Sequence, residues 1–320
     1  MRTVTLDRIL AVLVLALVGT GLLALKSGSA DAGWVFTVHG LVGGALLVAT
    51  ILKAARSVPG ALRAGHTTAV ALSLLLTAAI AGALVGGYVW VASGRLLGFG
   101  PWTLLSWHAW FGLAIVPLVV AHLLPRRWRA LRPPTRGGIS RRTLLVGGGL
   151  AAAGLLTFGL TSTIDRLAGG ARRFTGSRLL PAGSIPPATN FYREPAPTID
   201  LAAWRARVDG RSLSLVDLRA LGEVDVDVVL DCTSGWAVET TWRGVPLGNV
   251  LAIPDGSSLR VRSVTGWSTI LTADEARAAL LATGVAGGPL PVANGAPCRL
   301  VVPGRRGLDW VKWVDEVSLA

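Results

Sequence analysis

Five long apolar segments constrain the fold of this chain more than any other feature of its sequence. They cover approximately residues 9–25, 34–52, 67–91, 104–124 and 143–161. Each is close to the ~20 residues that an α-helix needs to cross the hydrocarbon core of a bilayer. Hydrophobic residues make up 52% of the chain and charged residues only 15%, which excludes an ordinary soluble protein. We therefore predict an all-α membrane bundle of five transmembrane helices in residues 1–164.

The basic residues predict how these helices are oriented. Residues 1–142 hold 14 Lys and Arg but only two acidic residues, so nearly all of the net charge of +13 lies there. This charge sits in short loops between apolar segments, so we interpret it as a topology signal and exclude nucleic-acid binding. The loops after the first and third helices carry only Lys26 and Arg95. The positive-inside rule then predicts a multi-pass protein of the bacterial cell membrane, with a cytoplasmic N-terminus and a C-terminal domain on the periplasmic or extracellular side.

The remainder of the chain has the character of a soluble domain. Residues 165–184 are rich in Gly, Pro and Arg, as is typical of a linker. Residues 185–320 contain short strand-like runs separated by turns such as Asp209-Gly210 and Asn294-Gly295. One helical stretch, residues 272–282, opens with Thr-Ala-Asp-Glu, a capping-box pattern. We predict an α+β domain with mostly antiparallel strands.

Four histidines, all in the first half of the chain, are candidate haem ligands. His39 and His108 lie about five residues from the outer ends of the second and fourth helices, and a glycine follows each by four residues. Ionisable residues inside a membrane usually mark functional sites, and two imidazoles at one depth can ligate a haem axially. His122 and His66 form a second candidate pair nearer the inner side, although the second helix has Lys53 where another histidine would be expected. The alternative is that these histidines only make interfacial hydrogen bonds.

The arrangement of these histidines resembles the membrane cytochrome b561-like family over about residues 5–125. The resemblance implies a b-type haem held by His39 and His108, and a second haem if His66 and His122 also form a pair. It also makes the quinone and quinol pool of the membrane the natural electron-transfer partner.

The stretch "VVLDCTSGWAVETTWRGVPLGNVL", residues 228–251, contains the most informative cysteine. A predicted strand ends at Cys232, where a turn exposes the side chain on a rigid support. A soft thiolate suits a soft or high-valent metal, whereas a buried structural cysteine is the alternative. The only other cysteine is Cys298.

This stretch is similar to the molybdenum-cofactor domain of the sulfite oxidase family. Residues 190–210 and 294–319 resemble two further blocks of that family, in the same order. The resemblance implies that Cys232 ligates molybdenum beside a pyranopterin (molybdopterin). Its phosphate end would be bound by arginine and lysine donors. The expected cofactor contacts are Asn190, Tyr192, Arg193, Thr233, Ser234, Trp236, Arg299, Arg305, Arg306, Gly307 and Lys312. The chain departs from the family at Asn294, where many relatives have His, and at Asp309 and Trp310, where many have Lys or Arg and then Ser.

Together these features predict a membrane-bound, molybdenum-dependent oxidoreductase. A small-molecule substrate would react at the Cys232 site by oxygen-atom transfer, and b-type haem would connect that site to the quinone pool. The direction stays open between reduction of a sulfoxide or N-oxide and oxidation of a substrate such as sulfite. Two alternatives are a cofactor-free, membrane-anchored binding module, which a Cys232–Cys298 disulfide would favour, and a haem-only cytochrome with a sensing domain.

Two adjacent arginines, Arg141 and Arg142, precede the fifth apolar segment in "SRRTLL". Such a pair resembles the twin-arginine signal of the pathway that exports folded proteins. Molybdenum cofactor is inserted in the cytoplasm, so a loaded domain would have to cross the membrane already folded. We expect this pair to direct the fifth helix and the C-terminal domain outward.

Overall fold

The computed structural model describes residues 3–63, 67–123, 141–189 and 195–320. The chain divides into two compact units. One comprises Met1–Ala24 with Asp31–Gly176, and the other comprises Leu25–Ala30 with Ser177–Ala320. The second unit therefore begins before residue 185, because the latter part of the predicted linker already packs with it.

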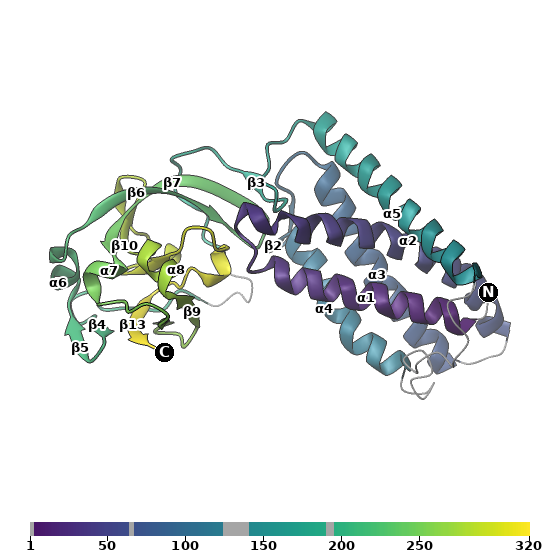
Figure 1. Cartoon of the computed structure of the whole chain (residues 1–320), viewed down its shortest axis with the longest axis horizontal. Helices are drawn as coiled ribbons and strands as arrows, with labels where there is room; N and C mark the ends of the chain where they lie inside the picture. Colours follow the sequence, from purple (N-terminus) through teal and green to yellow (C-terminus); the bar gives the residue numbers. More distant parts are fainter. Residues whose placement is uncertain (1–2, 64–66, 124–140, 190–194) are drawn as a thin grey trace. The chain divides into compact units, whose positions relative to one another are not determined.

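The first unit is a bundle of five long helices, whose chain neighbours run in opposite directions (Figure 1). They are α1 (Thr3–Ala24), α2 (Gly33–Arg63), α3 (Thr67–Ala92), α4 (Leu104–Leu123) and α5 (Arg141–Ala168). All five are long and apolar enough to cross a membrane. α2 and α5 extend past their apolar segments, because the helical hydrogen bonds continue into the flanking polar residues. A 3₁₀ turn (Ala30–Ala32) precedes α2, and the short strands β1 (Gly98–Phe99) and β2 (Trp102–Thr103) form a hairpin before α4.

Small residues allow α2 and α5 to pack closely. A Cβ atom added at Gly154 of α5 would lie 2.5 Å from the carbonyl oxygen of Leu41 in α2. One added at Gly44 of α2 would collide with the hydroxyl of Thr157. Stripes of small residues bring helix backbones together in this way inside membranes. On another face of α2, the Lys53 ammonium lies 2.5 Å from the Asp7 carboxylate of α1, an ion pair that joins these two helices.

The second unit contains two sheets with short helices at their edges (Figure 1). The first sheet has the order β11-β10-β7-β3, with β12 pairing with β10 and β6 pairing with β7. Its strands are β3 (Arg178–Leu179), β6 (Val224–Asp231), β7 (Trp236–Pro246), β10 (Leu280–Val285), β11 (Gly288–Pro289) and β12 (Arg299–Val301). All its strand pairs are antiparallel except β3–β7, which is parallel.

The second sheet has the order β5-β4-β13-β8-β9. Its strands are β4 (Ala206–Val208), β5 (Arg211–Leu213), β8 (Ser258–Ser263), β9 (Ser268–Thr272) and β13 (Val314–Leu319). Here β4 and β13 are parallel and the other pairs are antiparallel. The short helices are α6 (Leu215–Ala220), α7 (Leu247–Val250) and α8 (Ala273–Ala278), and the 3₁₀ turns η4 (Val292–Asn294) and η5 (Gly307–Asp309) lie in the C-terminal loops. The prediction of an α+β domain with mostly antiparallel strands is thus confirmed, and each of the two mixed sheets contains one parallel pair.

Local sequence signals account for much of this unit. The Asp209-Gly210 turn joins β4 to β5, as predicted. The capping box is confirmed, because the Thr272 hydroxyl accepts a hydrogen bond from the Glu275 N–H and the Glu275 carboxylate accepts one from the Thr272 N–H. α8 ends at Ala278, four residues earlier than predicted, because the chain turns into β10. Residues of β7 and β10 meet in a core that includes the fully buried Trp242, and every residue of β10 is buried.

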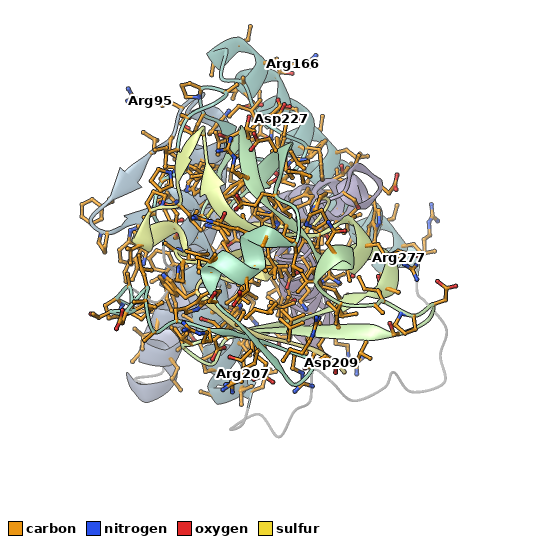
Figure 2. All side chains as sticks on the ribbon, turned by 90° about the vertical axis from the view of Figure 1, so that its left-hand side faces the viewer. Arg95, Arg166, Arg207, Asp209, Asp227 and Arg277 are labelled. Carbon is orange, nitrogen blue, oxygen red and sulfur yellow. The ribbon has the colours of Figure 1, made fainter. Side chains whose placement is uncertain are left out.

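Charged side chains at the edges of this unit contrast with those inside it. Arg207 and Arg277 point away from the fold (Figure 2). Arg207 pairs with Glu316 at 2.9 Å, and both side chains remain partly in water. Such exposed ion pairs contribute little to stability. Arg299 and Arg306, in contrast, are each only 3% exposed, so their charges require specific partners.

Candidate functional site

Cys232 lies directly after the end of β6, at the start of a tight turn into β7. The Cys232 N–H donates to the carbonyl of Trp236 at 2.8 Å, and the Gly235 N–H donates to the carbonyl of Cys232 at 3.0 Å. These bonds close the turn, so the cysteine has a fixed backbone. Its side chain is half-buried and its thiol is free. The strand-end position predicted from the sequence is therefore found.

Two hydroxyl groups surround the Cys232 sulfur. The Ser234 Oγ lies 2.8 Å from Sγ, and the Thr189 Oγ1 lies 3.2 Å from it. Ser234 belongs to the same turn, whereas Thr189 arrives from a segment 43 residues earlier. Thr233, between Cys232 and Ser234, is half-buried in the same turn.

The loop that contains Arg306 and Gly307 packs against this turn and forms hydrogen bonds with it. The Arg306 guanidinium donates to the Asp231 carboxylate at 3.0 Å, to the Cys232 carbonyl at 2.9 Å and to the Ser177 hydroxyl at 3.1 Å. A Cβ atom at Gly307 would lie 3.5 Å from the Cys232 Cα, so the loop backbone packs against the cysteine. In the structure the Arg306 guanidinium thus anchors the turn through a buried ion pair with Asp231, and its predicted contact with a phosphate stays a prediction.

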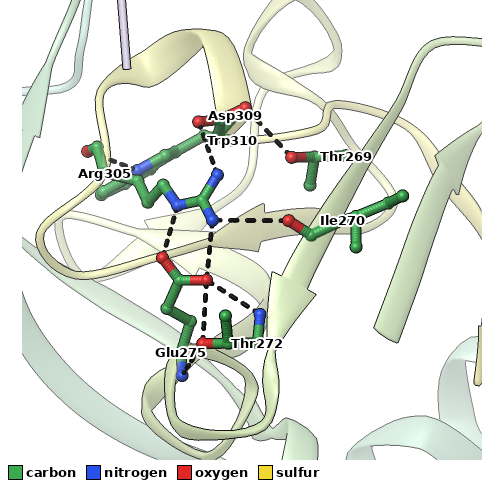
Figure 3. A network of polar contacts seen from close by, with 7 residues as sticks. All are labelled: Thr269, Ile270, Thr272, Glu275, Arg305, Asp309 and Trp310. Atoms are coloured by element: carbon green, nitrogen blue, oxygen red, sulfur yellow. Dashed lines mark hydrogen bonds and ion pairs between the residues drawn. The ribbon is translucent and has the colours of Figure 1, made fainter. Parts of the chain in front are cut away.

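Arg305, whose predicted contact with phosphate also stays a prediction, is paired with carboxylates in the structure. Its guanidinium binds both oxygens of Glu275, at 2.6 and 2.7 Å, and one oxygen of Asp309 at 3.1 Å (Figure 3). The second Asp309 oxygen accepts a hydrogen bond from Thr269 at 3.0 Å. These bonds from Arg305 hold the pKa of Glu275 below its usual range. Asp309, the departure from the family pattern, is thus compensated by Arg305 within the same loop.

Arg299 is a buried cation that has no carboxylate partner among the described residues. One of its terminal nitrogens donates to the Asn294 carbonyl at 2.8 Å, and the guanidinium lies 5.5 Å from the Trp242 ring and 5.8 Å from the Trp310 ring. No acceptor for its Nε lies in the part of the chain that the structure describes. Burial lowers the pKa of Arg299 to about 10, and the nearby Cys232 opposes this shift. The group therefore stays charged at neutral pH.

Lys312 and Trp236 complete this environment. The Lys312 ammonium donates to the Thr189 carbonyl at 3.1 Å and lies 5.4 Å from the Trp313 ring. Trp236 is buried, and its indole N–H has no acceptor within residues 141–189 and 195–320 or the other described residues. A buried donor without a partner costs about 1–3 kcal/mol, so such groups usually face a ligand, a water or an ion.

Cys298 has a different environment from Cys232. It is completely buried in the core of the second unit, and burial raises the pKa of its thiol far above the usual value. It is a free thiol, as is Cys232. A disulfide between the two cysteines, which would have favoured a cofactor-free module, is not formed.

His39 of α2 and His108 of α4 are brought together within the first unit. Their ring centroids are 5.9 Å apart and the ring planes are inclined by 75°. The His108 Nδ1 lies 2.7 Å from the Ala83 carbonyl, which can only accept, so this nitrogen carries the proton. The His39 Nδ1 lies 2.9 Å from the Thr20 hydroxyl, which donates its own proton to the Ala16 carbonyl at 2.7 Å. In the neutral form of each ring, a proton on Nδ1 leaves Nε2 unprotonated, and this is the nitrogen that can ligate a metal.

The second predicted histidine pair, His66 and His122, stays a prediction. His122 is half-buried near the end of α4. His66 lies outside the described residues, as do Asn190, Tyr192 and Arg193, so their predicted contacts stay predictions. Lys53, at the position where a fourth ligand would be expected, is paired with Asp7.

The family comparison concerns the second unit. Residues 193–320 match the model of the family described as oxidoreductase molybdopterin binding domain. These residues therefore form a molybdopterin-binding oxidoreductase domain, here called the molybdopterin domain.

Two curated relatives match part of the same chain. Both are named protein-methionine-sulfoxide reductase catalytic subunit MsrP, from Xanthomonas campestris pv. campestris and Xanthomonas axonopodis pv. citri. Each is 35% identical over 149 residues, which cover 38% of this chain and 46% of the relative. The chain thus spans about half the length of these relatives. Among solved structures, the sulfane dehydrogenase SoxCD from Paracoccus pantotrophus is similar with a TM-score of 0.36 and 23% identity, covering 39% of this chain and 40% of that chain.

The residues of the molybdopterin domain fit an anionic metal cofactor. Cys232 offers a free, half-buried thiol on a rigid turn, and thiolates are suitable ligands for such a metal. Arg299 and Trp236 each offer a buried donor that has no acceptor among the described residues. Arg305 and Arg306 are already paired with carboxylates in the structure, and their predicted cofactor contacts stay predictions.

Sequence reasoning missed several residues around Cys232. Thr189, Asp231 and Ser177 were not predicted, although all three contact Cys232 or its supporting arginine. The one sequence signal for Thr189 was its position, because this hydroxyl-bearing residue directly precedes the predicted 190–210 block. Ser177 gave none, because an isolated serine in a Gly-rich segment is typical of any loop.

Proposed function

We propose that this chain is a membrane-anchored, molybdopterin-dependent oxidoreductase that reduces a sulfoxide. The observation that carries the proposal is the rigid, free Cys232 thiol inside a domain of the molybdopterin-binding family. The choice of a sulfoxide rests on the 35% identity to two proteins named as methionine-sulfoxide reductases. The alternative is the opposite direction, oxidation of a substrate such as sulfite.

The bound cofactor would supply two-electron oxygen-atom transfer. The overall reaction consumes the sulfoxide, two electrons and two protons, and yields the sulfide and water. Cys232 would hold the metal through its sulfur, and the Arg306 contact to its carbonyl would keep the turn in place. Arg299 would neutralise the anionic end of the cofactor, with Lys312 as a second cation nearby. Asn190, Tyr192, Arg193, Thr233 and Trp236 complete the proposed cofactor contacts.

The five helices would anchor this domain in a bacterial cell membrane. Their length and apolar composition support a span for each helix. The distribution of Lys and Arg supports a cytoplasmic N-terminus and a C-terminal domain on the outer side. Electrons would then come from the quinone and quinol pool in the surrounding lipid.

His39 and His108 would bind one b-type haem between α2 and α4. Three features support this assignment: the two rings lie close together, both Nε2 atoms are unprotonated in the neutral rings, and both Nδ1 atoms are fixed by the protein. The glycines four residues after each histidine, Gly43 and Gly112, have open space where a side chain would lie. A flat macrocycle needs such space beside its ligands. A second haem at His66 and His122 has no comparable support.

Metal analysis, a visible difference spectrum and an activity assay test the proposal together. The purified full chain should contain about one molybdenum per chain and show the reduced-minus-oxidised spectrum of a b-type haem. It should also reduce a small sulfoxide with a reduced dye as the electron donor. His39→Ala and His108→Ala should remove the haem spectrum and leave molybdenum bound. Haem without molybdenum would instead favour a haem-only cytochrome, and a protein with neither would favour a binding module.

A further inference from the structure

The sulfur of Cys232 lies in a polar environment that the proposed function does not itself require. Two hydroxyl oxygens lie within hydrogen-bonding distance of Sγ, at 2.8 Å from Ser234 and 3.2 Å from Thr189. The two hydroxyls are 3.4 Å from each other, so the three atoms form a triangle. A sulfur atom is a weak acceptor, so a pair of hydroxyls at this distance is a distinctive arrangement.

Separate contacts hold each hydroxyl in place. The turn of Ser234 is closed by the Cys232–Trp236 backbone bond and supported by Arg306 at the Cys232 carbonyl. The segment of Thr189 is fixed at two carbonyls. The Asn294 side chain donates to the Pro186 carbonyl at 2.8 Å, and Lys312 donates to the Thr189 carbonyl at 3.1 Å. The amide of Asn294, where many family members have His, thus holds the Thr189 segment against the cysteine.

Once a metal is bound, the number of protons on these three groups determines which atom donates in each hydrogen bond. A metal-bound cysteine is a thiolate and has no proton to donate. Each hydroxyl has one proton, so both hydroxyls can donate to Sγ, and the longer 3.4 Å contact between them is given up. Bonds to an ionised acceptor are stronger than neutral ones, so the thiolate state favours this arrangement.

We propose that Thr189 and Ser234 are positioning residues whose hydroxyls donate hydrogen bonds to the metal-bound Cys232 sulfur and raise the reduction potential of molybdenum. This inference rests on the proposed function, since it requires molybdenum at Cys232. The physical reason is that a hydrogen bond withdraws electron density from the thiolate, which then stabilises the oxidised metal less. Hydrogen bonds to ligand sulfurs tune the potentials of other thiolate-bound metal centres in the same way.

The test is a redox titration of the full chain loaded with cofactor, followed by electron paramagnetic resonance of the molybdenum. Thr189→Val and Ser234→Ala remove one hydroxyl each and nearly preserve side-chain size. Each should lower the midpoint potential by the equivalent of an approximately tenfold change in the equilibrium constant, about 59 mV for one electron. The double variant should show a larger shift than either single variant.

Three controls separate this role from a merely structural one. Thr189→Ser and Ser234→Thr keep the hydroxyls and should keep the wild-type potential. Thr241→Val makes the same kind of substitution in β7, where the hydroxyl binds Asp227 at 2.5 Å, and should also leave the potential unchanged.

Each outcome has a definite meaning. Wild-type potentials in the double variant, with molybdenum bound, would overturn the inference and leave the proposed function intact. A wild-type chain without molybdenum would overturn both. If Thr189→Val or Ser234→Ala loses the metal, retention by its hydroxyl-preserving partner would support the hydrogen bond, and loss by both would show that the segment only needs its native residue for folding.

Discussion

At the scale of single residues, three arginines of the molybdopterin domain show how environment determines role. Arg305 and Arg306 are adjacent and look equally able to bind phosphate, yet carboxylates from Glu275, Asp309 and Asp231 hold them. Arg299 is buried, and its described guanidinium contacts are the Asn294 carbonyl and two tryptophan rings, without a carboxylate among the described residues. Because a buried unpaired charge is costly, Arg299 is the cation that gains most from an anionic ligand.

The two cysteines lead to the first prediction at this scale. Cys232→Ser should reduce sulfoxide turnover by more than about 100-fold, because it replaces the sulfur ligand itself, whereas loss of an outer-shell partner typically costs 10–100-fold. Turnover with a reduced dye, together with molybdenum content, measures this. Cys298→Ala is the matched control. It should cost about 1–2 kcal/mol of stability through a small core cavity and leave turnover near wild type. Unchanged activity in Cys232→Ser would refute the assignment of the ligand.

At the scale of elements, Arg305 connects α8 and β9 to the C-terminal loop that supports Cys232. The Glu275 carboxylate both caps α8 and receives the Arg305 guanidinium (Figure 3). A single carboxylate thus fixes a helix start and a loop, so its ionisation affects both.

This connection predicts a pH dependence. The folded-state pKa of Glu275 is lowered, first by hydrogen bonds from Arg305, so its contribution is fully present above the usual carboxylate pKa and is lost as the pH falls through the lowered value. Glu275→Gln should therefore cost about 1 kcal/mol at neutral pH and progressively less in acid. Denaturation monitored by tryptophan fluorescence at several pH values measures the difference. Arg277→Ala, at an exposed pair, should show almost no effect. A Glu275→Gln deficit that does not shrink in acid would contradict the prediction.

Close packing of α2 and α5 gives the second prediction at this scale. Gly154→Ala would place a methyl group 2.5 Å from the Leu41 carbonyl, so the helices must separate. We expect a loss of about 2–3 kcal/mol, as for other overpacked sites, and a clearly lower thermal midpoint in detergent. Gly159→Ala on the same helix is the matched control, because its added methyl group meets no atom within 4 Å. Equal midpoints for the two variants would show that this contact does not hold the helices together.

At the scale of the whole molecule, the order of the parts along the chain suggests how the protein is assembled. Arg141 begins α5, the last long helix before the molybdopterin domain. We proposed that the Arg141–Arg142 pair directs a folded, cofactor-loaded domain outward. The helices before it would insert by the ordinary route.

Replacing both arginines with Lys should therefore leave the molybdopterin domain on the cytoplasmic side, because the positive charge is kept but the twin-arginine pattern is lost. Protease accessibility in spheroplasts measures which side the domain occupies. The same double substitution at Arg172 and Arg173, an adjacent pair that follows α5, should leave export unchanged. Normal export of the Arg141/Arg142 variant would exclude this route.

The sequence by itself determined the features that depend on local physics. Five apolar segments of sufficient length predict five long helices whatever surrounds them, since each satisfies its own backbone hydrogen bonds. The Thr272–Glu275 capping box and the strand that ends just before Cys232 are likewise determined by residues that are neighbours in the sequence. Helix ends were less well predicted, because helical hydrogen bonds continue beyond the apolar residues.

Only the tertiary structure decided which side chains share the candidate site. Thr189 reaches Cys232 across 43 residues, and Arg306 reaches Asp231 across 75. No local sequence pattern predicts such pairings, because they result from how the sheets and loops pack. The same applies to His39 and His108, whose free nitrogens are set by Thr20 and by the Ala83 carbonyl on other helices. The sequence supplied the groups with reactive chemistry, and the packing determined which of them are already paired and which remain available to a ligand.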